Sequence, residues 1–531
     1  MTINLRLTEW RSFAQKHALF LVVLVLSAVS IASFYHYYQN GLGLAYNDAR
    51  SHLDIGRRVV EGLKPGIAQL GSVWLPLTHL LMILTIWNDF MWHSGLSGTI
   101  QSMAAFVGTG VIIYLFLREL GAGFLGRIIG VAVFVANLNI LYLQSTAMTE
   151  LMLLATMTAG VYMILLWYKK QKLLYLIYAA FWIMLSTLVR YDGWFLLAFT
   201  TLLLFLYLVK QKGYKIAEGT TILYVTLAAF GIFLWLLWNL LIFKDPLYFM
   251  FGPYSAYAQQ QTLQQAGNLL TKGNWLLSFK FYFYALAYNS GAFTLFLGLI
   301  GAIYLWTSKE ISAKVRYATL GLLAPLFFNV LALYLGHSVL FIQGLSGNTW
   351  FNVRYGVMLM PSIAIFVGYL VHKVSSLKTV LIGLLVFASF FAFANSDAVT
   401  IDDAQVGSSQ KNVTEVSSWL AQNTAGEKGF ILISAASHDA IIFSSGLPMK
   451  KFIHEGTGAY WESATKLPDH WARWIVMRSY SDLDATWRLV SQTPGFARYN
   501  IVERYPFADI YELKDIYLND LNTEPIYGKQ K

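Results

Sequence analysis

Long apolar runs separated by short polar loops fill the first 394 residues of the chain. A membrane-spanning helix needs about 20 consecutive, mostly apolar residues, because backbone polar groups inside lipid must be satisfied within the helix. The chain offers eleven stretches that approach or exceed this length. We therefore predict an α-helical polytopic membrane protein whose transmembrane domain covers residues 1–394. The predicted crossings are residues 17–37, 96–117, 128–145, 150–168, 173–189, 194–209, 218–242, 277–306, 317–336, 354–371 and 379–394.

One more apolar stretch, Val73–Trp87, differs from the others. It contains Pro76 and His79, and no basic residue flanks it at either end. Counting it as a crossing would place the later lysine-rich loops outside, against the positive-inside rule. We therefore predict a re-entrant or interfacial helix on the outer face, within a first external loop of residues 38–95.

Residues 395–531 have the composition of a soluble domain and alternate short β-type runs with helix-type runs. This alternation predicts a small α/β domain. His438-Asp439 and His454-Glu455 fit either fragments of a site or scattered polar residues on a solvated domain, and we favour the second interpretation. Helix-type patterns cover 413–422 and 482–491, a run at 440–445 leads into a Gly-Leu-Pro turn, and strand-type patterns cover 430–434, 474–478 and two pieces of 499–512.

The overall composition agrees with a membrane protein. Hydrophobic residues make up 57% of the chain and charged residues 12%, and the mean hydropathy is +0.53. In a soluble domain about a quarter of the residues are charged. The 17 Trp, 32 Tyr and 36 Phe suit aromatic belts at two membrane interfaces. The absence of cysteine excludes a disulfide framework and a thiolate metal site.

The net charge of +10 is concentrated in short loops between apolar runs. Such loops face the cytoplasm under the positive-inside rule, so the charge does not require a nucleic-acid partner. With the amino terminus inside, an uncleaved signal anchor as first span and eleven crossings, we expect the α/β domain outside a plasma (cytoplasmic) membrane. The basic loop residues are Arg6, Arg11 and Lys16; Arg118 and Arg127; Lys169, Lys170 and Lys172; Lys210, Lys212 and Lys215; Lys309, Lys314 and Arg316; and Lys373 and Lys378.

Two carboxylates stand at span ends on the predicted outer face, where ionisable groups are candidates for function. Asp48 follows the first span, with His52 one helical turn later. Asp48 fits a helix cap, or a general base that takes a proton from an arriving hydroxyl or amine. Glu150 opens a later span and fits, on equal terms, a cap, a metal ligand or a second carboxylate near the first.

Two arginines stand on the same predicted face. Arg190 lies in the turn Leu188–Trp194, where it either pairs with Asp192 or binds a phosphate with its guanidinium fork. Arg354, within Asn348–Tyr355, stands at an outer span end against the charge bias. A phosphate or headgroup role competes there with interfacial snorkelling.

These residues carry a resemblance to a known family. The chain resembles the GT-C superfamily of integral membrane glycosyltransferases, in the branch of protein O-mannosyltransferases and lipid A aminoarabinose transferases. The resemblance covers the whole chain in architecture, while its motifs are short. They are Asn47-Asp48-Ala49-Arg50, Gly71-Ser72-Val73-Trp74-Leu75-Pro76-Leu77, Met148-Thr149-Glu150, Arg190-Tyr191-Asp192-Gly193-Trp194, and Val353-Arg354-Tyr355 followed by Pro361.

The resemblance implies a sugar donor carried on a polyprenyl phosphate, an inverting direct displacement, and Asp48 as the base that deprotonates the acceptor. Relatives often show an Asp-Glu pair in the first loop, whereas Ala49 follows the acid here. Glu150 is therefore our candidate for the second acid. Glu150 and His52 are also the candidate metal ligands, and whether a divalent metal takes part stays open.

The remaining site expectations concern the ligands. We expect lipid phosphate or donor to be bound by Arg190, Arg354, Tyr355 and Arg58, and sugar or acceptor by Tyr191, Asp192, Trp74 and His79. The partners implied are a polyprenyl-phosphate-linked sugar, membrane lipid, and an acceptor glycan, lipid or protein.

Two other classes of protein compete with a transferase. External acids could bind ions in a transporter or lipid flippase, although transport sites usually lie midway through the spans. A binding protein with a membrane anchor would not need eleven crossings. Retained sugar transfer in Asp48→Asn would contradict the assignment of Asp48 as base.

Overall fold

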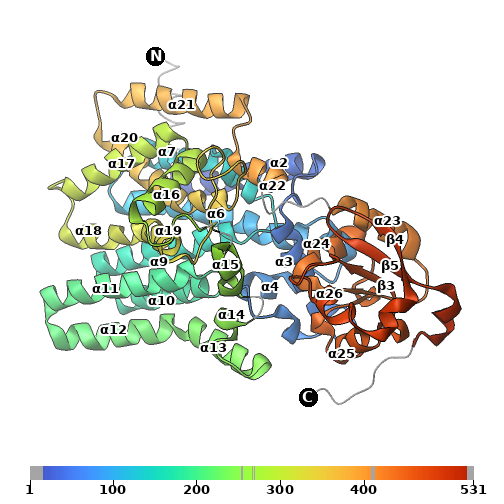
Figure 1. The fold of residues 1–531 in the computed structure, drawn as a ribbon. Coiled ribbons are helices and arrows are strands. Elements are labelled where there is room, and N and C mark those ends of the chain that lie inside the picture. Colours follow the sequence, from blue (N-terminus) through green and yellow to red (C-terminus); the bar gives the residue numbers. More distant parts are fainter. Residues whose placement is uncertain (1–15, 253–254, 266, 268, 408–412, 523–531) are drawn as a thin grey trace. The chain divides into compact units, whose positions relative to one another are not determined.

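The computed structural model describes residues 16–252, 255–265, 267, 269–407 and 413–522. Arg6 and Arg11 of the predicted cytoplasmic amino terminus lie outside these residues. The described residues form two compact units. We call residues 16–45, 72–78 and 99–407 the helical unit, and residues 46–71, 79–98 and 413–522 the α/β unit; Figure 1 shows their helices and strands.

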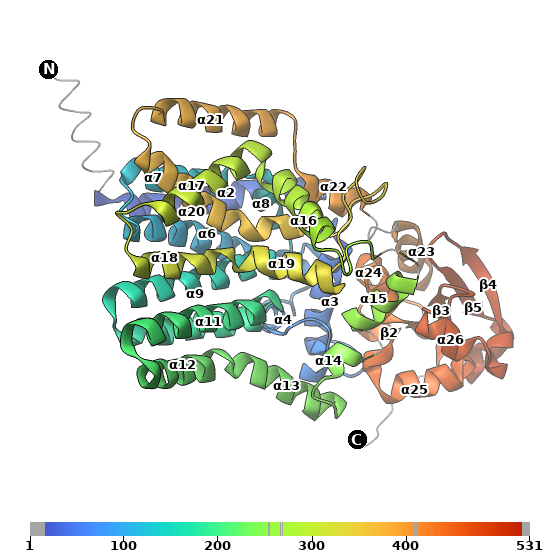
Figure 2. The same ribbon diagram turned by 60° about the vertical axis from the view of Figure 1, so that its left-hand side comes forward.

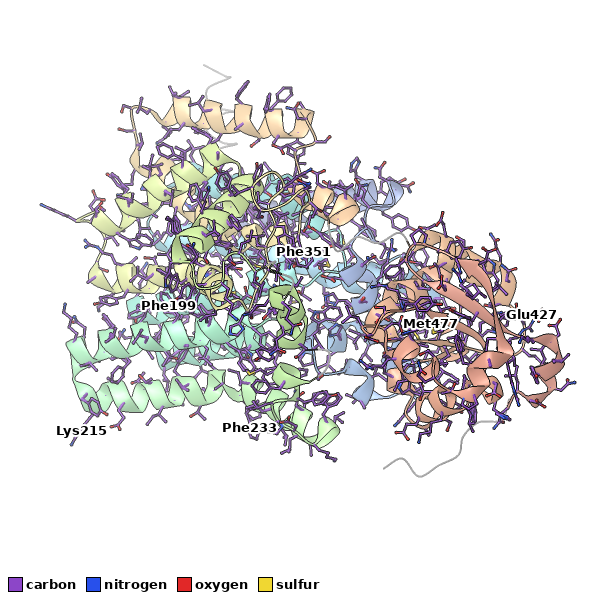
Figure 3. All side chains as sticks on the ribbon, in the orientation of Figure 1. Phe199, Lys215, Phe233, Phe351, Glu427 and Met477 are labelled. Carbon is purple, nitrogen blue, oxygen red and sulfur yellow. The ribbon has the colours of Figure 1, made fainter. Side chains whose placement is uncertain are left out.

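Apolar helices build the helical unit. α9 (Glu150–Lys170) is buried on nearly all sides, and so is α20 (Met360–Lys373), as expected of helices at the centre of a bundle. α2 (Ala18–Gln39) and α21 (Lys378–Ala394) instead expose many of their apolar side chains. The exposed side chains include Phe233 on α13, labelled in Figure 3. Such outward-facing apolar helices suit a lipid environment.

The other helices of this unit pack around that centre, and α10, which contacts both α9 and α12, lies between them in Figure 1; Figure 2 shows the same helices from another side. They are α6 (Leu96–Glu119), α7 (Phe124–Val135), α8 (Leu138–Leu143), α10 (Leu173–Thr187), α11 (Asp192–Lys212), α12 (Tyr214–Ala228), α13 (Phe230–Phe243), α14 (Tyr248–Phe251), α15 (Ala256–Gln265), α16 (Trp275–Ser290), α17 (Ala292–Thr307), α18 (Ala313–Leu320), α19 (Ala324–Leu335) and α22 (Val399–Val406), with the 3-10 helices η2 (Gly321–Leu323) and η3 (Val353–Leu359).

Glycine allows α7 to approach α20 closely. A Cβ added at Gly126 would stand 2.7 Å from the carbonyl oxygen of Gly368, and one added at Gly130 would stand 3.0 Å from the carbonyl oxygen of Ala364. Small residues at such crossings replace a hydrophobic driving force, which helices lack in lipid, with close van der Waals packing.

Seven helical stretches among the described residues are long and apolar enough to cross a membrane. Two bent pairs pass the same test together: α12 with α13, bent by 45°, and α16 with α17, bent by 108°. The shorter apolar helices α7 and α10 overlap the two remaining predicted crossings. α10 matches 173–189 closely, whereas α7 ends at Val135, ten residues before the end of the predicted crossing 128–145. The predicted class, a multi-pass helical membrane protein, is confirmed.

The region 277–306 departs from the prediction of one straight crossing. The chain turns by 108° between α16 and α17 at Gly291, whose φ of +76° suits a residue without a Cβ. Such a turn can return the chain toward the side from which it came. The total of eleven crossings, and with it the side of the membrane on which the α/β unit lies, therefore stays a prediction.

The stretch Val73–Trp87 contains one short helix, α4 (Leu77–Met82). Six residues span about 9 Å at a rise of 1.5 Å per residue, far less than a bilayer core of about 30 Å. This helix is too short to be a crossing, in agreement with the prediction; its place on the outer face stays an expectation.

The α/β unit contains a five-stranded sheet with strand order β2-β1-β3-β5-β4. β2 and β3 pair with β1 in parallel, and β5 pairs with β3 and β4 in antiparallel fashion. The predicted α/β domain is confirmed. The strands are β1 (Phe430–Ile433), β2 (Phe452–Ile453), β3 (Ala472–Met477), β4 (Tyr499–Arg504) and β5 (Asp509–Leu513).

The strand sequences follow their places in the sheet. The central strands β1 and β3 are nearly continuous apolar runs buried on both faces, and Met477 at the end of β3 is fully buried (Figure 3). The edge strand β4 exposes all but its first residue and carries Glu503 and Arg504, charges that discourage edge-to-edge pairing. The two-residue strand β2 was not predicted, because a run that short has no detectable period.

Helices from two distant parts of the chain complete the α/β unit. From the first loop come α3 (Asn47–Val60), η1 (Ile67–Leu70), most of α4 and α5 (Asp89–His93). From the carboxyl-terminal part come α23 (Thr414–Thr424), α24 (Ala435–Ser445), η4 (Met449–Lys451), η5 (Glu455–Thr457), α25 (Ala459–Lys466), η6 (Pro468–His470), α26 (Ala485–Val490), η7 (Pro494–Arg498) and η8 (Asp515–Asp520). The predicted boundary at residues 394 and 395 stays a prediction, while the compact units divide the chain differently.

The favoured interpretation of His438-Asp439 and His454-Glu455 as polar residues on a solvated surface is wrong. His438 and His454 are buried, and the Asp439 side chain is 11% exposed. His438 Nε2 pairs with Asp484 Oδ2 at 2.6 Å, and Glu455 accepts from the Ala435 N–H at 2.8 Å. These side chains are built into the interior of the unit.

Candidate active site

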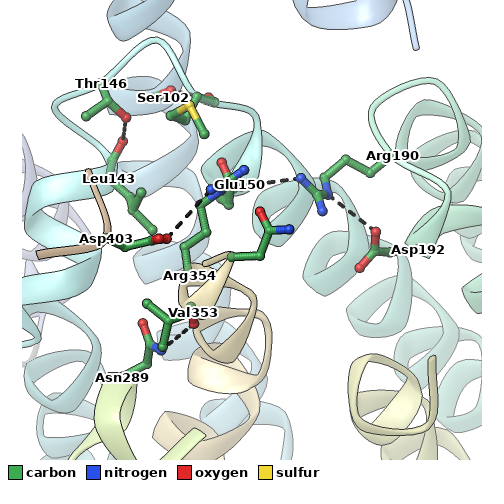
Figure 4. Close-up of polar contacts among 12 residues, drawn as sticks. Ser102, Leu143, Thr146, Glu150, Arg190, Asp192, Asn289, Val353, Arg354 and Asp403 are labelled. Carbon is green, nitrogen blue, oxygen red and sulfur yellow. Dashed lines mark hydrogen bonds and ion pairs between the residues drawn. The ribbon is translucent and has the colours of Figure 1, made fainter. Parts of the chain in front are cut away.

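Glu150 is the centre of a buried ionic group in the helical unit (Figure 4). It occupies the first turn of α9, and its exposure is 0%. The N-cap residue is Thr149, so Glu150 is not the cap itself, although a carboxylate in the first turn is favoured by the helix dipole. The turn before α9 is held by a hydrogen bond from Ser102 Oγ to the Met148 carbonyl, 3.1 Å long.

Two arginines converge on one oxygen of Glu150. Arg190 Nη1 lies 3.3 Å from Oε1, and Arg354 Nε lies 3.1 Å from the same atom. The exposed fractions of the two arginine side chains are 21% and 5%. The structure therefore brings together three of the site residues predicted from the sequence, although Arg354 and Glu150 are 204 positions apart.

Arg190 has a second carboxylate partner. Its Nε donates to Asp192 Oδ2 at 3.3 Å, so the pairing considered from the sequence exists alongside the contact with Glu150. Asp192 begins α11 and is buried. The ring of Tyr355 adds a contact that both arginines share: its centroid lies 4.9 Å from the Arg190 guanidinium carbon and 5.5 Å from that of Arg354.

The position of Arg354 is set by the backbone around η3. Asn289 donates from Nδ2 to the Val353 carbonyl at 2.7 Å. The residue before η3, Asn352, has a φ of +56°, a left-handed conformation that asparagine tolerates better than most residues, and its side chain bonds the Val339 carbonyl. These contacts fix the start of the helix from which Arg354 extends.

Sequence reasoning missed Asp403 on α22. Its Oδ2 lies 3.7 Å from Arg354 Nη1, and Asp403 is fully buried. α22 is held in place by Asn139, whose Oδ1 accepts from the Thr400 N–H at 3.0 Å and from the Thr400 hydroxyl at 2.9 Å. The acid pair Asp402-Asp403 just after the last apolar run was the available sequence signal.

The group thus holds two arginines and three carboxyl groups in a mostly apolar surrounding. Buried charges of this kind persist only when they are paired, because their desolvation is costly. A further anion, such as a phosphate, would share the guanidinium N–H donors with these carboxylates.

Aromatic residues of the predicted sugar or acceptor set lie beside this group. Tyr191 stacks on Phe249 with ring centroids 5.7 Å apart and packs edge-on against Trp194 at 5.3 Å. They pack around a buried cluster that includes Leu75 and Trp235. Trp74 is the neighbour of Leu75 and half-buried.

The remaining predicted site residues belong to the α/β unit. Asp48 lies in the first turn of α3 and is half-buried; the N-cap of this helix is Tyr46, so neither Asn47 nor Asp48 is the cap residue. His52 follows one turn later, which places it on the same helix face as Asp48. His52 Nδ1 and His79 Nε2 share a hydrogen bond of 2.8 Å.

Arg58 is occupied by a carboxylate rather than left for a phosphate. Its Nη1 and Nη2 donate to the two oxygens of Asp439 at 3.3 and 3.4 Å. This bidentate pair joins α3 to α24 across 381 positions of sequence.

The described residues do not fit a divalent metal site. Among them, no three His, Asp or Glu side chains form a group that could hold a metal ion. Oε1 of Glu150 is paired with two arginines, and Nδ1 of His52 shares a hydrogen bond with His79. No step proposed below passes through a metal.

No protein-family model matches the chain, and neither does any curated protein sequence. Solved structures do match. ArnT from Cupriavidus metallidurans in the apo state aligns with a TM-score of 0.59 and 13% identity, covering 94% of this chain and 98% of that one. The same enzyme bound to undecaprenyl phosphate aligns with a TM-score of 0.57 and 11% identity, covering 93% and 98%.

A third match extends the comparison. The archaeal oligosaccharyltransferase AglB from Archaeoglobus fulgidus, in complex with an inhibitory peptide and a dolichol-phosphate, has a TM-score of 0.53 and 10% identity and covers 87% of this chain and 70% of that one. AglB and ArnT are both GT-C glycosyltransferases. The fold of this chain is therefore the GT-C fold, as the resemblance in sequence implied.

Proposed function

We propose that this protein is a glycosyltransferase that moves a monosugar from a polyprenyl-phosphate donor to an acceptor. The observation that carries the proposal is the convergence of Arg190 and Arg354 on Glu150 inside an apolar helical body. Two guanidinium groups so placed suit the phosphate of a lipid whose chain needs an apolar surrounding. The likeness in fold to ArnT bound to undecaprenyl phosphate and to AglB with a dolichol-phosphate supports a lipid-phosphate donor.

The chemistry is a direct displacement at the anomeric carbon. An oxygen or nitrogen of the acceptor forms the new bond to that carbon, the bond from the carbon to the phosphate oxygen breaks, and the polyprenyl phosphate leaves with the electron pair. Attack from the face opposite the leaving group inverts the anomeric configuration. Asp48 takes the acceptor proton, and His52 on the same helix face shares a hydrogen bond with His79 through which that proton can move on.

The leaving group needs no acid, because the polyprenyl phosphate that departs is stable as an anion at neutral pH. Arg190 and Arg354 stabilise the charge that develops on it. Glu150, the candidate second acid, then has a defined task in this unit: it holds both arginines in one orientation before the donor arrives. Tyr191, Asp192 and Trp74, which belong to the same unit, contact the sugar or acceptor in this proposal.

The reaction takes place at the outer face of the plasma membrane in this proposal, with the α/β unit outside. The alternative in a different class is a transporter or flippase that moves the intact lipid. The two differ in a product: only the transferase releases free polyprenyl phosphate.

The test uses the full-length protein purified in lipid nanodiscs. It is incubated with a panel of radiolabelled polyprenyl-phosphate monosugars, and the release of polyprenyl phosphate and the transfer of label are measured. We expect one member of the panel to be consumed, with consumption lost in Arg354→Gln and kept in Arg488→Gln, an exposed arginine of the α/β unit. Movement of the intact donor across the membrane of proteoliposomes, without cleavage, would favour the transporter. If no donor in the panel were consumed, the proposal would be contradicted.

A further inference from the structure

Two buried carboxyl groups face each other where α3 packs against α24. Both helices belong to the α/β unit and lie side by side in both ribbon views (Figures 1 and 2). Asp54 on α3 has an exposure of 0%. Its neighbour is Asp439 on α24, and the two carboxyl groups lie within electrostatic reach of each other and of Arg58.

The fixed donors around this pair account for three of its four oxygens. Trp92 Nε1 donates to Asp54 Oδ1 at 3.1 Å. Arg58 donates to both oxygens of Asp439. Among the described residues no fixed donor reaches the second oxygen of Asp54. Two ionised carboxylates have no hydrogen to share, so a hydrogen bond between them requires a proton on one.

We propose that Asp54 is a protonated carboxylic acid that donates to the Asp439 carboxylate, and that this single proton holds α3 against the carboxyl-terminal part of the α/β unit. We call the three side chains Asp54, Asp439 and Arg58 the proton joint. Asp54 is the acid because the Arg58 guanidinium donates to both oxygens of Asp439, whereas the donor on Asp54 is the neutral indole of Trp92.

The groups around the joint do not supply a second cation. On α3, the neighbouring Arg57 is bound to Glu61 and Asp89. On η5, burial and the nearby Arg58 hold the pKa of His454 well below its usual range, so His454 is neutral. Glu455, also on η5, adds a negative charge near Asp439.

The other histidines near the joint are also accounted for. On α24, His438 is paired with Asp484 at 2.6 Å. On α5, burial lowers the pKa of His93, the residue after Trp92, so this ring is neutral above mildly acidic pH. Arg58 is thus the cation that donates to Asp439, and its charge acts on both carboxyl groups.

The electrostatics agree with this geometry. Burial, and then the charge of Asp439, raise the pKa of Asp54 well above its usual range, and burial raises the pKa of Asp439 to about 6. An acid whose pKa is raised by folding contributes its full stabilisation below the pKa that it has in the unfolded chain, and this contribution is lost as the pH rises from there through the folded-state pKa. The shared proton is therefore bound at acidic to neutral pH, and the contact between α3 and α24 weakens at alkaline pH.

The joint has a consequence for the proposed reaction, and this step rests on the proposed function. Asp48 and Asp54 are on the same helix, so the contact that holds α3 also positions the candidate base. Asp54 and Asp439 are positioning residues in this scheme: they touch neither donor nor acceptor.

The first experiment measures the proton without any assay of activity. Infrared spectra of the full-length protein in nanodiscs at about pH 7 should show a protonated carboxyl band that is lost in Asp54→Asn and kept in Asp482→Asn, an exposed control in the same unit. Asp439→Asn should also lose the band, because the new amide can donate to an ionised Asp54. A band unchanged in both variants, or no such band in the wild type, overturns the proposal.

The second measurement follows thermal unfolding with pH. The wild-type midpoint should fall between about pH 6 and about pH 9, whereas Asp54→Asn should be flat over this range, since its amide replaces the shared proton. Equal slopes in the two proteins would contradict the joint. If Asp54→Asn does not fold, the proposal is still tested by the infrared spectra of the wild type, which should show the protonated carboxyl band, and of Asp439→Asn, which should lack it.

The third measurement concerns Asp48. If the transferase activity exists, its alkaline limb should follow the loss of the joint and move to higher pH in Asp54→Asn, with kcat affected more than KM. If no transfer activity were found, the proposed function would be contradicted. The proton joint would not be, because the infrared and unfolding measurements do not depend on activity.

Discussion

The helical unit and the α/β unit each bury a group of charges, and they neutralise them by different means. Around Glu150, two arginines face three carboxyl groups, so fixed cations do most of the compensation. Around Asp439, one arginine faces two carboxyl groups, and a proton is needed for the second. Guanidinium groups stay charged at every accessible pH, whereas a shared proton leaves in alkali.

The difference bears on what each group can do. An arginine pair can exchange one anionic partner for another, which is what binding of a lipid phosphate requires. A proton shared by two carboxyl groups cannot be exchanged for a phosphate, but it is released when the pH rises. The first arrangement suits a ligand site and the second suits a structural contact that responds to conditions.

The largest effect is expected where a fixed cation is removed. Arg354→Gln leaves Glu150 and Asp403 buried with one guanidinium fewer, which should destabilise the helical unit by about 3–5 kcal/mol. Donor consumption should be lost as well. Unfolding by a denaturing detergent in the variant and in Arg488→Gln checks the first result, and a stability equal to the control would show that the Glu150 group is not held by its charges.

Asp48→Asn keeps the size of the side chain and removes its charge, so it tests the proposed role of Asp48 as the base. Loss of a general base should lower kcat by about 10²- to 10⁴-fold while leaving the unfolding midpoint unchanged. Rates of sugar transfer and thermal unfolding, measured on one preparation, check both parts. Transfer at the wild-type rate would remove Asp48 from the mechanism.

Arg58→Gln converts the proton joint into a pair of acids without a cation. Because Arg58 lowers the pKa of Asp439, its removal should raise that pKa further, so that the α/β unit keeps its proton to higher pH. A charged hydrogen bond is also lost, at a cost of about 1.5–3 kcal/mol. Unfolding midpoints should be lower than those of the wild type, and their fall with rising pH should extend to higher pH. An unchanged curve would contradict the assignment of Arg58 to the joint.

The smallest effect is expected at Asp403. Its oxygen is 3.7 Å from Arg354, a longer contact than the 3.1 Å contact of Glu150, so it is the easier partner for a phosphate to displace. Asp403→Asn should therefore tighten donor binding by about twofold to tenfold, no more than about 1.4 kcal/mol. Equilibrium binding of labelled donor measures this change, and weaker binding would indicate that Asp403 orients Arg354 instead of competing for it.

Local pattern was enough to predict most of the elements. The apolar runs marked every crossing region, and the strand runs near residues 430 and 474 mark β1 and β3, because both signals depend on residues close in sequence. The bend at Gly291 was missed, since hydropathy does not report direction.

The pairings within the two buried groups depend on distant parts of the chain. Glu150, Arg190 and Arg354 were chosen one by one as exceptions to the local charge pattern, and their convergence could not be derived from spacing. Asp439 was assigned to the surface because nothing near it in sequence shows that Arg58 and Asp54 cover it. Burial of a polar residue is decided by tertiary partners, which a single sequence does not display.

The pairing of α3 with α24 also constrains the order in which the protein is made. α3 leaves the ribosome long before α24, and at about 5–20 residues per second the 381 positions between Arg58 and Asp439 take roughly 20 to 80 s to synthesise. During that interval Arg58 has no Asp439 to bind, and the apolar face of α3 has no carboxyl-terminal partner. Nascent chains stalled before residue 435 should therefore be unusually dependent on chaperones, and a carboxyl-terminal truncation should damage the first loop as much as the segment it removes.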